Sequence, residues 1–165
     1  MNNLTQYESY FRDEIVTKYQ RINGFYHIDM FEFDSFVRDL RGKKYEVPLL
    51  VLEPYTTGTI ANYNDNICDA ISGALVILGQ YDPRTGKDEE SKTAFLTSME
   101  EITRQIKNKM IADKKIPYHP IRGLILPSIS MAKTEVIANT FQGYRLSFSI
   151  ETKADMELKT DDWIL

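Results

Sequence analysis

The clearest pattern of hydrophobic and polar positions lies in the last third of the chain, between Tyr144 and Glu151. Apolar side chains occupy the even positions from 144 to 150, and polar side chains occupy the odd positions from 145 to 151. Successive side chains of a strand point to opposite faces of a sheet, so this alternation predicts a strand with one buried and one open face. We expect it to be the second strand of a long two-stranded hairpin over residues 121–151.

Hydrophobic residues at spacings of three and four predict two helices. Thr5 and Glu8 form a possible capping box at the start of the first helix, and Asn23-Gly24 is expected to end it. The second helix, over residues 88–113, is acidic at its start and rich in lysine near its end, which suits the helix dipole. The apolar stripe of the first helix is Leu4, Tyr7, Phe11, Ile15 and Tyr19, and that of the second is Phe95, Met99, Ile102, Ile106 and Met110.

Shorter apolar runs predict further strands. Residues 25–33 alternate weakly, and a short helix capped by Asp34 and closed by Gly42 is expected to follow. Residues 47–52 are predicted to be a strand that lies near a sheet edge or has Pro48 at its start.

The middle of the chain is less clear. Residues 56–59 contain Gly58 and are predicted to be a turn or loop. The run 67–78 is apolar at both odd and even positions, so it is compatible with a strand or with a buried helix. Gly73 at its centre favours the strand, because glycine weakens a helix.

Together these elements predict an α+β fold, in which an antiparallel or mixed sheet carries a long amphipathic helix on one face and an N-terminal helix. With no linker in the sequence, residues 1–165 are predicted to form a single domain with a charged C-terminal tail at 153–165. The tail ends in the apolar triplet Trp163-Ile164-Leu165, so we expect it to dock on its own domain or on a neighbour.

Composition narrows the class of protein. The 165 residues are 42% hydrophobic, as in ordinary globular domains, and the net charge of -4 is spread along the chain, which disfavours nucleic-acid binding. No secretory signal and no apolar run of about 20 residues occur, so we expect a soluble protein of a reducing cytoplasm, with no membrane partner. The single cysteine, Cys68, excludes an intramolecular disulfide and is expected to be a small buried residue.

Candidate chemistry is sparse. His27, Asp29, Glu32 and Asp34 have ligand-type side chains close in sequence, but a polar strand face explains them better than a metal site does. The polar run 62–69 lacks the glycine and glutamate of a calcium loop, and the residues Asp155, Glu157 and Lys159 are only a fragment of a nuclease set. Hydrolase and phosphate-loop motifs do not occur. We therefore expect no catalytic residue, metal or cofactor.

The remaining candidate site is an interface. The polar row of the alternating strand can be a solvated sheet face or a partner-binding face, and the apolar end of the tail can add to it. The candidate interface residues are Arg145, Ser147, Ser149, Glu151 and Trp163.

The element order ends in the strand Gly143-Tyr144-Arg145-Leu146-Ser147-Phe148-Ser149-Ile150. This order resembles that of the tail terminator and tail-completion (head–tail joining) proteins of tailed phages. The segment 29–43 and the longer tail depart from that pattern. The resemblance implies a virion protein, assembled in the host cytoplasm, that forms a ring, usually a hexamer, and meets tail tube and neck proteins. The alternative is a small cytoplasmic module that binds a protein or peptide without catalysis.

Overall fold

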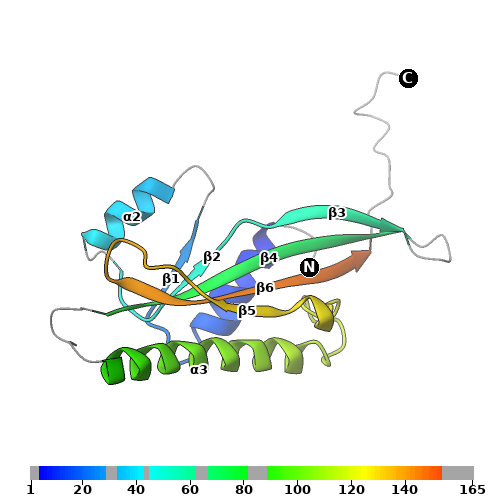
Figure 1. The fold of residues 1–165 in the computed structure, drawn as a ribbon. Coiled ribbons are helices and arrows are strands. Elements are labelled where there is room, and N and C mark those ends of the chain that lie inside the picture. Colours follow the sequence, from blue (N-terminus) through cyan, green and yellow to red (C-terminus); the bar gives the residue numbers. More distant parts are fainter. Residues whose placement is uncertain (1–3, 29–32, 43–44, 62–66, 82–88, 154–165) are drawn as a thin grey trace, which may run out of the picture.

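The computed structural model describes residues 4–28, 33–42, 45–61, 67–81 and 89–153, which form an α+β fold (Figure 1). Its centre is a mixed six-stranded sheet in the order β1-β2-β4-β6-β5, with β3 paired to β4 beside β2. A long helix runs along one face of this sheet, and a second helical segment begins the described chain. The predicted fold class is therefore confirmed.

The N-terminal helical segment begins as α1 (Leu4–Ser9) and continues as the wider π-helical η1 (Tyr10–Val16). Its predicted stripe is buried at positions 7, 11 and 15, whereas Leu4 is 50% exposed. The predicted boundaries are wrong, because Thr5 lies inside α1 and the helical segment ends at Val16, well before Asn23-Gly24. Gly24 instead begins a strand, and no described glycine has the positive φ of a helix cap.

Two parallel strands, β1 (Gly24–His27) and β2 (Leu49–Leu52), are joined through the helix α2 (Phe33–Arg41). β1 covers only the start of the strand predicted over 25–33, and positions 29–32 lie outside the described residues. The predicted short helix is confirmed by α2, but Asp34 lies inside its first turn and is not its cap. Pro48 directly precedes β2, which lies between β1 and β4, so Pro48 marks a strand start rather than a sheet edge.

An antiparallel pair, β3 (Thr56–Ala61) and β4 (Ile67–Gln80), follows. The turn or loop predicted at 56–59 is wrong: these threonine-rich residues pair with β4, and β-branched side chains suit that pairing despite Gly58. The strand predicted over 67–78 is confirmed. Its residues are apolar at both odd and even positions because helices cover both faces of the sheet at the end of β4 that holds Val76 and Leu78.

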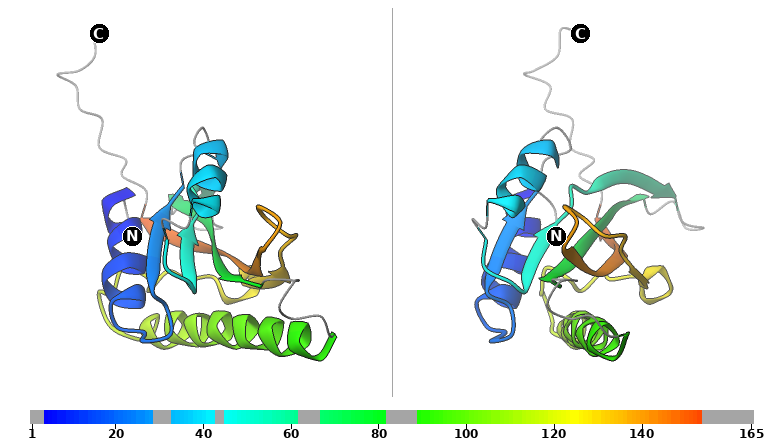
Figure 2. Two further views of the ribbon diagram at one scale, coloured as in Figure 1. Left: turned by 90° about the vertical axis from the view of Figure 1, so that its left-hand side faces the viewer. Right: turned by 60° about the vertical axis from the view of Figure 1, so that its left-hand side comes forward.

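The long helix α3 (Glu89–Asp113) confirms the strongest sequence prediction. Along its stripe Phe95 is half-buried, and the other four side chains, Met99, Ile102, Ile106 and Met110, are buried. Figure 2 shows α3 running beneath the sheet, with the N-terminal helical segment on the same side and crossing it steeply.

The chain after α3 matches the prediction in part. The short β5 (Ser130–Lys133), which follows the 3-10 helix η2 (Leu126–Ser128), pairs antiparallel with β6 (Phe141–Lys153), and isolated bridges join Leu124 to Ile150 and Ile137 to Phe141. The hairpin predicted over 121–151 is therefore present, but its first arm is interrupted by η2, which contains Pro127, and proline cannot donate to a strand ladder. The pairing of β6 along its whole length with β4 was not predicted.

The two faces of the sheet are covered unequally. One face is covered by the N-terminal helical segment and α3, in a core that includes Phe11, Leu75, Ile106 and Phe148. The other face is covered at one end by α2, through Phe36 and Leu40. No described helix packs on the remainder of that face, which we call the open face.

Candidate functional site

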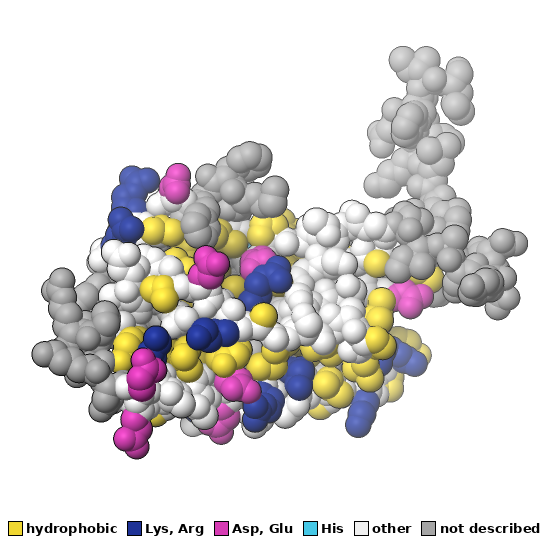
Figure 3. Space-filling model, viewed as in Figure 1, with side chains coloured by type: hydrophobic (Ala, Val, Ile, Leu, Met, Phe, Trp, Pro, Cys, Tyr) yellow, Lys and Arg dark blue, Asp and Glu magenta, His cyan; other side chains and the backbone are white. Residues whose placement is uncertain are grey.

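The open face is formed by β3, β4, β6 and β5, and most of its side chains are small. Residues opposite each other in antiparallel strands share a face, so the register places Thr56, Ser72 and Ser149 in one row and Ala74, Ser147 and Ser130 in the next. In Figure 3 the middle of the visible surface is white, the colour of uncharged polar side chains and backbone. The described residues of this face include Thr56, Gly58, Cys68, Ala70, Ser72, Ala74, Ser130, Ala132, Arg145, Ser147, Ser149 and Glu151.

Serine hydroxyls on this face hydrogen-bond one another across the strands. The Oγ atoms of Ser72 and Ser149 lie 3.0 Å apart, and those of Ser130 and Ser147 lie 2.8 Å apart. Ser128 Oγ accepts a hydrogen bond from the Ser149 N–H at 2.7 Å. These pairs hold the hydroxyls in place, so the serine rows form a surface of short, ordered side chains, which another surface can approach at little entropic cost.

One ion pair lies at the boundary between the open face and the part covered by α2. Arg145 donates from Nε and from an Nη atom to the two carboxylate oxygens of Glu53, each at 2.7 Å. The hydrogen bond to Glu53 raises the pKa of Arg145, so the guanidinium remains charged. Because Glu53 lies in the bend between β2 and β3, this bidentate contact ties that bend to β6.

A shallow hollow of about 370 Å³ lies beside this pair. Its lining includes Glu53, Pro54, Ser128 and Arg145 together with residues of β3, β4 and β6. Among the described residues that line the hollow, the one carboxylate, of Glu53, and the one guanidinium, of Arg145, pair with each other.

A buried polar contact ties the N-terminal helical segment to α3. The Tyr10 hydroxyl donates to Asp113 Oδ2 at 3.0 Å, and Lys109 donates to the other carboxylate oxygen. Asp113 is 2% exposed. Burial, and then the charge of Asp113, raises the pKa of Tyr10 well above its ordinary value. The contact satisfies a buried carboxylate and is structural.

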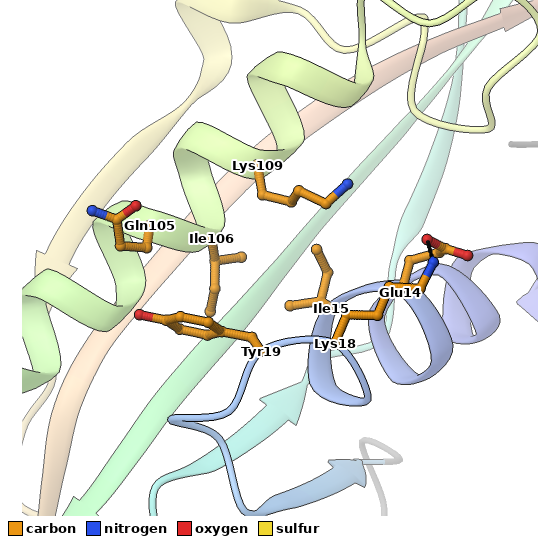
Figure 4. A pocket seen from close by; sticks show the side chains of 7 residues that line it. All are labelled: Glu14, Ile15, Lys18, Tyr19, Gln105, Ile106 and Lys109. Atoms are coloured by element: carbon orange, nitrogen blue, oxygen red, sulfur yellow. Dashed lines mark hydrogen bonds and ion pairs between the residues drawn. The ribbon is translucent and has the colours of Figure 1, made fainter.

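A crevice lies between η1 and α3 (Figure 4). Ile15 and Ile106 form its apolar part, and Lys18 and Lys109 point toward its rim. Its volume of about 200 Å³ is smaller than the roughly 300–1,000 Å³ of typical ligand pockets, so we assign no ligand to it.

The metal hypothesis gains no support from the described residues. His27 Nδ1 lies 3.6 Å from a carboxylate oxygen of Glu8, while Asp29 and Glu32 lie outside the described residues. Among the residues that the structure describes, no three His, Cys, Asp or Glu side chains gather closely enough to hold a metal ion. The nuclease candidates 155, 157 and 159 and most of the calcium-like run, 62–66, also lie outside them.

The prediction that Cys68 is buried is wrong, because its side chain is partly exposed near the end of β4. A hydrogen bond to Glu151 raises the pKa of the thiol, which keeps it protonated and weakens it as a nucleophile.

Of the predicted interface residues, the structure brings Arg145, Ser147, Ser149 and Glu151 together on one face of β6, and Trp163 lies outside the described residues. Sequence reasoning missed the partners that complete the face, above all Glu53, Ser72 and Ser130. Glu53 stands beside Pro54 in a stretch that predicts a loop, so no local signal identified it.

Comparisons with known protein families, with curated proteins and with solved structures find no match for this chain. Within the described residues, no helix is both long enough and apolar enough to cross a membrane.

Proposed function

We propose that this chain is a structural assembly protein, of the kind found in phage tails, that acts by ring-type self-association through the open face and the edges of its sheet. The ring, usually of six subunits in such proteins, would meet tail tube and neck proteins in a virion assembled in the host cytoplasm. The observation that carries the proposal is the uncovered, small-residue face together with the two strand edges that border it.

The two edges differ, which favours a head-to-tail arrangement. β3 borders β4 at residues 67–72, whereas β5 borders β6 at residues 144–147, which oppose β4 residues 74–77, so the two edges lie on opposite sides of the sheet and are offset along it. No described strand pairs with the outer edge of either. β3 has the sequence Thr-Thr-Gly-Thr-Ile-Ala, with none of the charges or prolines that usually prevent an exposed edge from pairing. Pairing β3 of one subunit with β5 of the next is heterologous, and a heterologous contact generates a ring when the rotation between subunits closes.

Cross-linking tests this arrangement. In a chain with Cys68→Ser, cysteines are introduced at Thr56 and Ala132, two exposed positions on the open-face side of β3 and β5. A short bismaleimide is expected to give a ladder of oligomers from the double variant, T56C/A132C, and only monomers from each single variant. Dimers from T56C alone would indicate a symmetric contact and contradict the head-to-tail arrangement, and monomers from the double variant would contradict pairing of these edges.

A further inference from the structure

The most exposed aromatic side chain of the described residues belongs to Tyr118, at 97% exposure. It follows Pro117 in a turn closed by a hydrogen bond from the His119 N–H to the Ile116 carbonyl oxygen, at 3.3 Å. Its φ is 62°, and glycine or asparagine usually occupies a turn position with such a positive φ. A tyrosine here strains the backbone and gains no packing among the described residues. A contact made by the side chain would explain its presence.

Around Tyr118 the loop 114–122 is basic and partly apolar. Lys114 Nζ donates to the Arg122 carbonyl oxygen at 3.1 Å, which brings the two ends of the loop together. Ile116 is 47% exposed, and no described carboxylate forms an ion pair with Lys115 or Arg122. In Figure 3, Lys and Arg side chains gather with hydrophobic ones at the lower right, near the end of α3. We call residues 114–122 the basic loop.

The basic loop lies next to the end of β6. The Glu151 N–H donates to the Gly123 carbonyl oxygen at 2.9 Å, so the chain directly after the loop touches β6 two residues before β6 ends at Lys153. Glu151 is the described acidic group beside this junction. Whatever follows β6 therefore starts beside the basic loop.

The sequence that follows β6 complements the basic loop in charge and in apolar character. Residues 154–165 hold four acidic side chains and one lysine, and they end in Trp163-Ile164-Leu165. A flexible chain as long as the segment between Lys153 and Trp163 has a root-mean-square length of roughly 17 Å. That reach suits a site that begins at the end of the same strand, where a tethered segment has a high effective concentration.

We propose that residues 154–165 dock on the basic loop of the same chain, with Trp163 against Tyr118 and Ile116 and the acidic side chains near Lys115 and Arg122. This contact is independent of the assembly proposed above, since it involves neither the open face nor the edges of β3 and β5. It assigns a role to a tyrosine that strains its own turn.

Trp163 is the only tryptophan of the chain, so its fluorescence reports the docking directly. In the full chain we expect blue-shifted emission and weak quenching by acrylamide, both independent of protein concentration. The double variant I116S/Y118A is expected to shift the emission to that of exposed tryptophan and to raise the quenching constant several-fold. Val136→Ser, at an apolar position that is 55% exposed, is the matched control and should change neither.

A second variant keeps the test decisive if the first one perturbs the loop itself. Reversing two charges, in K115E/R122E, is expected to expose Trp163 as well, and high salt should do the same in the unaltered chain. Emission of exposed tryptophan in the unaltered chain would overturn the proposal, and so would blue-shifted emission that both variants leave unchanged. A blue shift that grows with protein concentration would indicate docking between chains and would overturn docking within one chain.

Discussion

The Tyr7 hydroxyl lies against Gly73, at the centre of the sheet: a β-carbon on Gly73 would be 2.4 Å from the hydroxyl oxygen. The same hydroxyl donates to the Glu53 carbonyl oxygen at 3.1 Å. Glycine at this position thus lets α1 approach the middle of β4, and the tyrosine links α1 to the bend that carries the Arg145–Glu53 pair. The helix side of the sheet and the open face are connected through these few residues.

Gly73→Ala is expected to lower the free energy of unfolding by about 1–3 kcal/mol, because its methyl group overlaps the Tyr7 hydroxyl. Tyr7→Phe alone should cost about 1 kcal/mol, through loss of the hydrogen bond to Glu53. The double variant should be more stable than the sum of the two losses predicts, since the phenylalanine lacks the overlapping atom. Urea unfolding of the four proteins measures this coupling, and strict additivity would contradict the close contact.

The Arg145–Glu53 pair should contribute modestly to stability, because the side chains are 47% and 29% exposed. Arg145→Lys keeps the charge but loses the two-pronged contact, and we expect a loss of about 0.5–1 kcal/mol. Arg104→Lys is the matched control, since Arg104 pairs with Glu100 on the exposed side of α3 and should cost about 0.3 kcal/mol or less. Equal losses for the two variants in chemical denaturation would contradict a special role for Arg145.

Alkaline pH should destabilise the fold through two buried tyrosines. Burial raises the pKa of Tyr7 and of Tyr10 in the folded chain, whereas the unfolded chain ionises its tyrosines near pH 10. The unfolded state therefore loses protons first, so stability is fully present below about pH 10 and falls as the pH rises further. Denaturation midpoints measured at pH 8 and above pH 10 should differ less in Y7F/Y10F than in the unaltered chain. Tyr118→Phe, which alters an exposed tyrosine, should leave that difference unchanged.

Tyr118→Gly should raise the free energy of unfolding by about 1 kcal/mol, because glycine adopts the φ of 62° without strain and the exposed ring contributes no packing. Thermal or urea unfolding, done on a chain shortened after Lys153, separates this effect from any docking of the last residues. Val136→Gly, at another exposed apolar position, is the control and should not stabilise. A loss of stability on Tyr118→Gly would contradict a strained turn.

Periodic patterns predicted the elements that bury one face and leave the other face outside the core. The stripe of α3 and the alternation of β6 are confirmed because each presents one face to the core and one away from it. The strand at 67–78 was favoured through Gly73, and the structure gives that glycine a further reason, the close approach of Tyr7.

Pairing between distant strands could not be predicted from such patterns. Besides β5, β6 pairs with β4, more than sixty residues earlier in the chain, and nothing local in the last third indicates that second partner. The strand β3 was missed because Gly58 predicts a turn while its pairing with β4 decides the structure. The open face needed both facts, since Thr56, Ser72 and Ser149 form one row only through these two pairings.

The absolute mass of the protein in solution, measured by native mass spectrometry over a range of concentrations, tests the assembly proposal most directly. We predict that the 19.1 kDa chain gives a closed oligomer near six subunits as concentration rises. Ser147→Arg, which places a long charged side chain on the open face, should return it to the monomer. A monomer at every concentration, or an oligomer that Ser147→Arg leaves unchanged, would contradict the account.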